Sequence, residues 1–302
     1  MKKAMCCGIL ASFFFAFTFL LNRSINLAGG YWLWSACLRY LFMLPMLALL
    51  LMIRPGNQLR PVFASVHQRP VPWILWSTVG FGLFYLPLTL ASVYGESWLT
   101  AASWQITIVA GVLLTPLFGK RIPLKNLAMS AVILIGIVIL QLPNISGQTF
   151  QNNCAAFLPI LIAAFCYPLG NRKMMQLCPP EFDTIQRVFG MTLCSMPFWL
   201  LSAAAAFLIS GAPGSGQILQ SLGVALFSGV IATILFFHAT DLVKQNQKML
   251  AAVEATQCGE VLFTLLGGVL VLGDPFPGMV SVFGLLLIVG GMIANSLVCS
   301  IG

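Results

Sequence analysis

The sequence predicts an all-α integral membrane protein with ten transmembrane helices, arranged as two inverted five-helix repeats. Three observations support this prediction: an apolar composition, ten apolar runs of membrane-spanning length, and a one-sided distribution of lysine and arginine. Of the 302 residues, 59% are hydrophobic and only 7% are charged, whereas soluble domains carry about 25% charged residues. A soluble domain of this size would lack a polar surface, so we expect lipid to surround most of the chain.

Crossing the hydrocarbon core of a bilayer takes about 20 predominantly apolar residues. Runs near this length lie at 4–21, 31–53, 72–94, 97–118, 124–141, 154–170, 185–209, 218–240, 247–271 and 278–299. The first run follows Lys2 and Lys3 like the core of a signal peptide, but no small-residue cleavage pattern precedes the polar pair Asn22-Arg23. We therefore interpret it as a retained helix.

Lysine and arginine fall almost entirely in alternate loops. With the N-terminus placed in the cytoplasm, Arg23 is the exception outside, and Arg39 lies within the second helix. Cytoplasmic loops are enriched in basic residues, so we expect both termini on the cytoplasmic side of a bacterial-type plasma (inner) membrane. Basic residues spread in this way form no patch for a nucleic acid. The inside segments hold Lys2, Lys3, Arg54, Arg60, Arg69, Lys120, Arg121, Lys125, Arg172, Lys173, Arg187, Lys244 and Lys248.

The predicted repeats are residues 1–141 and 154–302, within one integrated membrane domain. Because each repeat holds five helices, an odd number, the second must be inverted relative to the first. The turn at 119–123 is basic and the corresponding turn at 273–277 is acidic, as opposite sides of a membrane require. Inverted repeats are typical of transporters. An offset of 154 residues aligns Gly119, Pro123 and Gly136 with Gly273, Pro277 and Gly290.

Two stretches, Trp104–Gln141 and Cys258–Asn295, resemble the drug/metabolite transporter superfamily in its ten-helix EamA form. In that family a mid-helix glutamate precedes the acid of a Leu-Gly-Glu turn by fourteen residues, and Glu260 and Asp274 match this spacing. Val261 departs from the proline that commonly follows the glutamate. The resemblance implies transport of a small molecule and names no substrate. The segments that resemble its multidrug resistance efflux transporter-like branch are Asn22-Arg23, Gly29-Gly30, Trp32 and Leu38-Arg39-Tyr40.

Three ionisable residues within the apolar runs are candidates for function, because a charge inside the bilayer is costly. Arg39 lies too deep to reach the interface easily, so it either forms a structural pair or contacts substrate. Glu260 and Glu254 are candidates both for substrate binding and for proton coupling, and Glu260 is the preferred coupling residue.

Polar residues form matching stripes on two predicted helices, 97–118 and 247–271. Glu254, Gln257 and Glu260 share one face at helical spacing, and the 154-residue offset maps Thr100 onto Glu254. Such stripes also join membrane helices to one another, but we interpret these two as walls of a central cavity. The predicted substrate-binding residues are Arg39, Tyr40, Tyr85, Thr100, Trp104, Thr107, Glu254, Gln257 and Glu260.

The runs at 4–21 and 154–170 are the shortest, they occupy corresponding positions, and the second contains Pro159 and Pro168. Short or interrupted helices at matching positions of two repeats indicate a binding site between them.

The expected function is secondary transport of small organic compounds by alternating access. One arginine and two glutamates within the spans favour export of cationic or zwitterionic metabolites or drugs. The alternatives are a metabolite exchanger or facilitator on the same fold, and a channel or scaffold without coupled transport. With two histidines, nine scattered cysteines and no C-x-x-C, phosphate-loop or nucleophile motif, we expect no enzyme activity, metal or cofactor. The expected partners are a small-molecule substrate and the lipid bilayer, for a monomer or homodimer.

Overall fold

The computed structural model describes residues 2–119, 121–122, 124–144, 148–243, 249, 253 and 255–299; the side chains of 124–126, 144, 148–154 and 296–299 are outside this description. The described part of the chain is helical and contains no strand. Its elements are α1 (Lys2–Leu27), α2 (Trp32–Met52), α3 (Leu59–Gln68), α4 (Pro70–Ser77), η1 (Thr78–Gly82), α5 (Leu83–Tyr94), α6 (Ser97–Trp104), α7 (Ile106–Leu113), η2 (Thr115–Phe118), α8 (Leu124–Gln141), η3 (Leu142–Asn144), α9 (Gln148–Leu177), α10 (Thr184–Ser210), α11 (Ser215–Val224), η4 (Ala225–Ala232), α12 (Thr233–Asp241), α14 (Cys258–Gly267), η5 (Gly268–Leu272) and α15 (Met279–Cys299).

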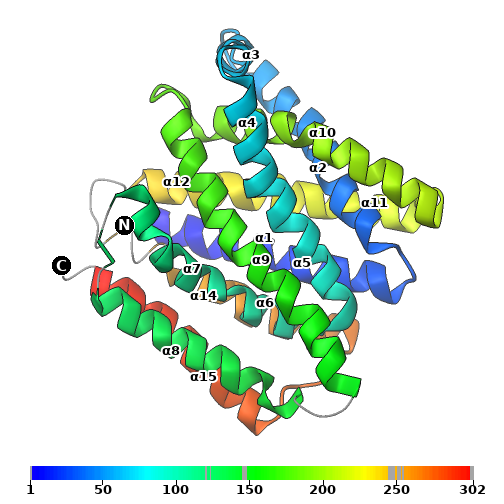
Figure 1. Ribbon diagram of the computed structural model, residues 1–302, viewed down its shortest axis with the longest axis vertical. Helices are drawn as coiled ribbons and strands as arrows, with labels where there is room; N and C mark the ends of the chain where they lie inside the picture. Colours follow the sequence, from blue (N-terminus) through cyan, green and yellow to red (C-terminus); the bar gives the residue numbers. More distant parts are fainter. Residues whose placement is uncertain are drawn as a thin grey trace.

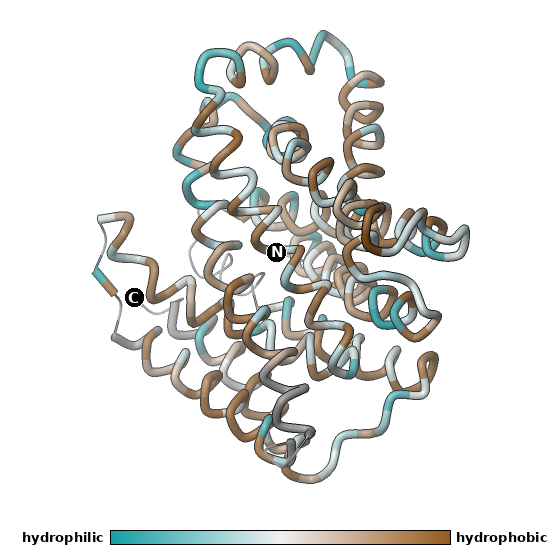
Figure 2. Tube along the Cα trace, turned by 45° about the vertical axis from the view of Figure 1, so that its right-hand side comes forward, coloured by the Kyte–Doolittle hydropathy of each residue, from teal (hydrophilic) through white to brown (hydrophobic). Residues whose placement is uncertain are grey.

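Within the described residues, six helical segments are long and apolar enough to cross a membrane: Lys2–Leu27, Trp32–Met52, Pro70–Tyr94, Ala155–Leu177, Thr184–Ser210 and Ser215–Asp241. Shorter apolar helices are Ser97–Leu113, Leu127–Gln141, Cys258–Leu272 and Met279–Asn295. Figure 2 shows hydrophobic residues along the helices and more hydrophilic ones around several connecting turns. Large apolar side chains such as Leu208 and Leu270 are exposed. An apolar exterior of this kind needs lipid as its solvent, so the chain is a multi-pass membrane protein.

Glycine contacts set how closely the helices approach one another. Figure 1 shows α8 and α15 side by side, and Gly136 of α8 faces the backbone of Gly284 of α15. Gly80 in η1 lies directly against Gly170 of α9. Small residues allow membrane helices to pack backbone to backbone. The remaining long helices pack as α2 against α10, and as α1 against η4, α12 and α14.

The prediction that the first and sixth spans are short was wrong. Helix α1 has 26 residues and α9 has 30, and α9 continues through Pro159 and Pro168. The polar pair Asn22-Arg23, expected to follow the first span, lies inside α1 because both side chains find partners. Asn22 donates from Nδ2 to the Tyr85 hydroxyl at 2.9 Å, and Arg23 pairs with Asp274.

Side-chain contacts define two ends of the molecule. At one end Arg54 pairs with Asp183, and Gln186 donates to the carbonyl oxygen of Gln58. We call this the basic end, because Arg187 lies one turn after Asp183 in α10 and Arg60 lies at the start of α3, next to Gln58; by their place at the neighbouring helix ends we also assign Arg69, Arg121, Arg172 and Lys173 to it. At the opposite end the Trp34 indole donates to the carbonyl oxygen of Gly211, and Gln217 donates to that of Tyr31.

Candidate functional site

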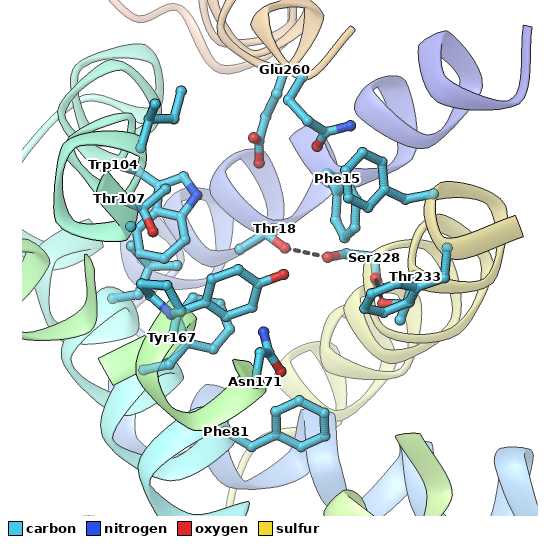
Figure 3. Close-up of a pocket in the computed structure, with 18 of the residues that line it drawn as sticks. Phe15, Thr18, Phe81, Trp104, Thr107, Tyr167, Asn171, Ser228, Thr233 and Glu260 are labelled. Carbon is cyan, nitrogen blue, oxygen red and sulfur yellow. Dashed lines mark hydrogen bonds between the residues drawn. The ribbon is translucent and has the colours of Figure 1, made fainter. Parts of the chain in front are cut away.

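A cavity of ≈ 480 Å³ lies among the helices. Its lining comes from α1, α2, η1, α5, α6, α7, α9, α10, η4, α12, α14 and α15, so both halves of the chain contribute. Figure 3 shows Glu260 on one side of the space, with Trp104 and Tyr167 on another and Thr18 near the middle. A concave site that combines an apolar wall with a few polar groups is the usual form of a small-molecule site.

The apolar wall of the cavity is a cluster of aromatic rings. Phe84 packs against Trp104 with ring centroids 5.1 Å apart and against Tyr167 at 4.7 Å. Trp104 and Tyr167 meet edge to face at 5.6 Å. Helix α5 provides Phe84, α6 provides Trp104 and α9 provides Tyr167. Because the three rings come from three helices and fix one another, they form a rigid surface for an apolar or aromatic group.

Arg39 is held in the cavity wall by aromatic rings. Its guanidinium carbon lies 4.1 Å from the Tyr85 ring centroid and 5.7 Å from that of Tyr40, and the residue is 5% exposed. Tyr40 in turn stacks on Trp199 at 4.5 Å. The Nη1 of Arg39 donates to the hydroxyl of Thr18 at 3.3 Å, and the Nε of Arg39 is buried with no partner among the described residues.

Glu260 stands in the first turn of α14 and is 7% exposed. The side chain of Gln105 is close enough to hydrogen-bond to its carboxylate, and the charge of Arg39 acts on it from across the cavity. Two further polar atoms of the cavity lining are buried with no partner among the described residues, the Nε2 of Gln257 and the Oδ1 of Asn295. These unfilled groups give a bound molecule both donors and acceptors to contact.

Two hydroxyl groups meet near the middle of the cavity. Thr18 of α1 and Ser228 of η4 form a short hydrogen bond, drawn dashed in Figure 3. The π-helical turn at η4 widens the helix at this place, which is a frequent feature of functional sites in helices.

Toward the basic end the lining becomes cationic. Arg172 donates from Nη1 to the carbonyl oxygen of Gly111 at 2.7 Å and lies over the Phe118 ring. Arg187 lies over the Phe237 ring, 5.1 Å from its centroid. Both arginines belong to the cavity lining, so the cavity extends from Arg39 to basic side chains of the basic end.

The opposite end is held together by a buried carboxylate. Asp274, which follows η5, accepts hydrogen bonds from the Ser97 backbone at 3.1 Å and from its hydroxyl at 2.5 Å. Arg23 of α1 lies 3.9 Å from the other oxygen. The Trp98 indole donates to the carbonyl oxygen of Pro275 at 3.2 Å. These contacts fasten α1, the start of α6 and the 273–278 loop to one another. We call the group Arg23, Ser97 and Asp274 the Asp274 network.

Most of the residues expected to bind substrate come together at this cavity. Tyr85 supports Arg39 from behind, while the Thr100 hydroxyl donates to the carbonyl oxygen of Glu96 in its own helix, and neither lines the cavity. Glu254 lies outside the described residues. The expected residues that line the cavity are Arg39, Tyr40, Trp104, Thr107, Gln257 and Glu260.

Sequence reasoning missed several lining residues. Tyr167 and Asn171 sit beside Pro168 in α9, and that proline was a signal for this part of the helix. Thr18 is a polar residue in a phenylalanine-rich run, and its partner Ser228 is 210 positions away. Arg172 and Arg187 were assigned to a cytoplasmic loop by their charge alone, because the sequence gives no sign that they reach back over the cavity.

No cluster of three or more histidine, cysteine, aspartate or glutamate side chains suited to a metal occurs within the described ranges. The cavity lining offers charged groups, hydrogen-bonding groups and aromatic surface, which suit the binding of a small molecule.

Comparison with known proteins assigns the class. The family described as "EmrE: Putative multidrug resistance efflux transporter" matches residues 2–300, and the chain belongs to this family. A relative in Bacillus subtilis (strain 168), "Uncharacterized protein YjlA", is 48% identical over 307 residues, which cover 97% of this chain and 94% of the relative. A second relative, from Shouchella clausii, is the "Uncharacterized 42.1 kDa protein in intracellular alkaline protease 3'region". It is 48% identical over 268 residues, covering 85% of this chain and 70% of its own length.

One solved structure, described as "Crystal structure of protein", shares the fold with a TM-score of 0.60. It is 19% identical in sequence, and the match covers 98% of both chains. The likeness therefore extends over the whole arrangement of helices.

Proposed function

We propose that this protein is a secondary transporter that exports small cationic or zwitterionic organic compounds by alternating access. The observation that carries the proposal is the asymmetry of the cavity. It reaches the arginines of the basic end, whereas the Asp274 network fastens the helices at the opposite end. This combination is that expected of a carrier with its site accessible from one side of the membrane. The proposal places the basic end and both termini in the cytoplasm.

The proposed architecture is ten spans in two inverted repeats, 1–141 and 154–302. Backbone geometry at the aligned turns supports it. Gly119 and Gly273, 154 positions apart, both end their helices with left-handed backbone at φ 71° and φ 70°. Such φ values favour glycine, so the matching glycines have one physical cause. Rocking of two such repeats against each other is the usual means of alternating access.

Packing pairs give further support for the repeats. The third predicted span, α4–η1–α5, packs on the sixth, α9; the eighth, α11–η4–α12, packs on the first, α1. In two five-span repeats the first span corresponds to the sixth and the third to the eighth. The pair formed by spans three and six therefore corresponds to the pair formed by spans eight and one. The third and the eighth span also each contain a π-helical turn, η1 and η4.

Glu260 is the proposed coupling residue, because it is the one carboxylate among the described residues that line the cavity. Gln105 of the α6–α7 segment, Arg39 of α2 and Tyr167 of α9 are the polar and charged groups that act on it. A carboxylate that exchanges a proton for a substrate charge links transport to the proton gradient. The second candidate, Glu254, lies outside the described residues.

Purified protein in liposomes tests the proposal. A thermal-shift screen with amino acids, nucleosides, sugars and lipophilic cations identifies a ligand, and radiolabelled ligand then measures flux. An alternating-access carrier gives saturable uptake that unlabelled ligand on the other side of the membrane accelerates. Flux that rises linearly with concentration would identify a channel, and absence of flux with every stabilising ligand would identify a scaffold. An exchanger or facilitator on this fold gives saturable flux that is independent of a proton gradient.

A further inference from the structure

The charges of the cavity narrow the substrate class. We infer that Arg39 is a receptor for an acidic group, so that the transported compounds are zwitterions with an apolar portion rather than simple cations. This inference rests on the proposed function. It is carried by a buried guanidinium for which the described residues hold no counter-charge, and by acceptors in the lining of the same cavity.

Arg39 has no counter-charge among the described residues. An arginine side chain carries five N–H donors, yet among the described residues only Thr18 accepts a hydrogen bond from them, at 3.3 Å, and Nε is buried with no acceptor there. In the part of the chain that the structure describes, no carboxylate oxygen lies within 4.0 Å of the guanidinium. A buried charge is tolerated when a partner neutralises it. The planar guanidinium fits a carboxylate through two parallel hydrogen bonds, and the open cavity beside Arg39 leaves room for one.

The other charges disfavour a lone cation. Arg39, Arg172 and Arg187 line the cavity, and Glu260 is the acidic residue among the described lining. A like charge in a poorly hydrated space is repelled strongly. The guanidinium of Arg39, for which the described residues hold no counter-charge, therefore disfavours a cation that lacks an acidic group.

The second charge of a zwitterion has its own place. Glu260 and Arg39 interact electrostatically but are not in contact. In the lining of the same cavity, the Oδ1 of Asn295 is a buried acceptor with no partner among the described residues. A carboxylate and an amide oxygen together suit an ammonium group, which carries three donors. A dianion would lack this contact and would place an uncompensated negative charge against Glu260.

The apolar part of the substrate faces the rings of Phe84, Trp104 and Tyr167. Figure 3 shows Trp104 and Tyr167 beside the space into which Glu260 points, and Phe84 and Arg39 belong to the lining of the same cavity. Aromatic surfaces bind apolar and aromatic groups and also stabilise a neighbouring ammonium through their faces. The cavity therefore presents an acid receptor, an amine receptor and an apolar wall to one compound.

Three matched probes test the inference. L-Phenylalanine carries both charges, its methyl ester lacks the acid, and its N-acetyl derivative lacks the amine; the corresponding leucine compounds form a second set with an aliphatic side chain. Binding is measured by titration calorimetry with detergent-purified full-length protein. We expect at least one of the two zwitterions to bind about tenfold or more tightly than its ester, since the ester loses the charged hydrogen bonds to Arg39.

Substitutions locate the effect. Arg39→Lys retains the charge and loses the planar fork, so it should abolish the preference for the zwitterion over the ester while leaving binding of the ester unchanged. Arg54→Lys is the matched control outside the cavity, at the exposed ion pair of the basic end, and should retain the preference. Glu260→Gln should weaken binding of the zwitterion and leave that of the N-acetyl compound unchanged or tighter. Size-exclusion profiles verify that each variant is folded.

The outcomes separate the inference from the function on which it rests. If esters or lipophilic cations bind and are transported in the liposome assay while neither zwitterion binds, the transporter proposal stands and the acid receptor is refuted. An unchanged zwitterion preference in Arg39→Lys also refutes it. If no compound of any class gives saturable flux, the proposed transport function is refuted, and the inference that rests on it is refuted with it.

Discussion

The Asp274 network offers a direct measure of alternating access. In Asp274→Asn the side chain still accepts from Ser97 but loses its charge and its attraction to Arg23. Hydrogen bonds to a charged group contribute about 1.5–3 kcal/mol and neutral ones about 0.5–1.5 kcal/mol, so the two bonds from Ser97 lose about 2 kcal/mol together. The Arg23 contact, at 3.9 Å and partly exposed, adds at most about 1 kcal/mol.

If the state closed at the opposite end loses about 2 kcal/mol of stability, the equilibrium between this state and the state open at that end shifts toward the open state by roughly 30-fold, since each 1.4 kcal/mol is a factor of ten. Labelling kinetics report this shift. In a chain with its nine cysteines replaced, Ser228→Cys places a thiol near the middle of the cavity. Its reaction with an impermeant reagent supplied at the opposite end should accelerate by roughly the same factor in Asp274→Asn, because labelling follows the open population.

Asp183→Asn is the control. It breaks the exposed ion pair with Arg54 at the basic end, and exposed pairs contribute about 0–1 kcal/mol, so labelling from the opposite end should stay unchanged. If Asp274→Asn lowers the melting temperature and leaves the labelling rate at the wild-type value, the network stabilises the fold without controlling access to the cavity. The argument that it closes one end of a transporter would then be wrong.

Three further predictions concern topology, packing and coupling. A cysteine at Ser215 should react with an impermeant reagent in intact cells and one at Gln176 should not, and the reverse pattern would overturn the orientation. In α15, Gly291→Ala should lower the melting temperature because its Cβ would lie 2.8 Å from Ile133, whereas Gly290→Ala next to it meets no atom within 4 Å and should not; overpacking of this kind costs about 1–3 kcal/mol, and equal melting temperatures would contradict the helix contact. Glu260→Gln should make transport independent of pH, because the side chain can no longer exchange a proton, and a wild-type pH profile in liposomes would assign coupling elsewhere.

The cavity shows where residue counting along the sequence was incomplete. The charge inventory within the predicted spans gave one arginine and two glutamates, which favoured a cation as readily as a zwitterion. Arg172 and Arg187 lie near helix ends and therefore looked like cytoplasmic orientation signals. They line the cavity because α9 and α10 run past it, and long basic side chains can extend along apolar surface with their charge at its edge.

The sequence by itself determined the class of molecule. Its lack of charge requires lipid, and lipid requires helices, because each backbone group must be satisfied within its own segment. Arg39 and Glu260 could be selected for the same reason, since a charge inside an apolar run is costly whatever surrounds it. Trp104, Thr107 and Gln257 followed from helical periodicity, which sorts residues onto faces before any partner is known.

Only the tertiary structure decided which faces meet. Thr18 finds Ser228 across 210 positions, and Arg23 and Ser97 find Asp274 from two other helices. Thr100 shares a stripe with the cavity residues, yet its hydroxyl is satisfied by its own helix at Glu96. Periodicity gives the direction of a side chain about one helix axis, but the depth and crossing of helices depend on contacts such as Gly80 against Gly170. Those contacts join residues that come together only when the chain folds. The shape of the cavity and the partner of each charge therefore depend on the tertiary structure and could not be predicted from periodicity along the sequence.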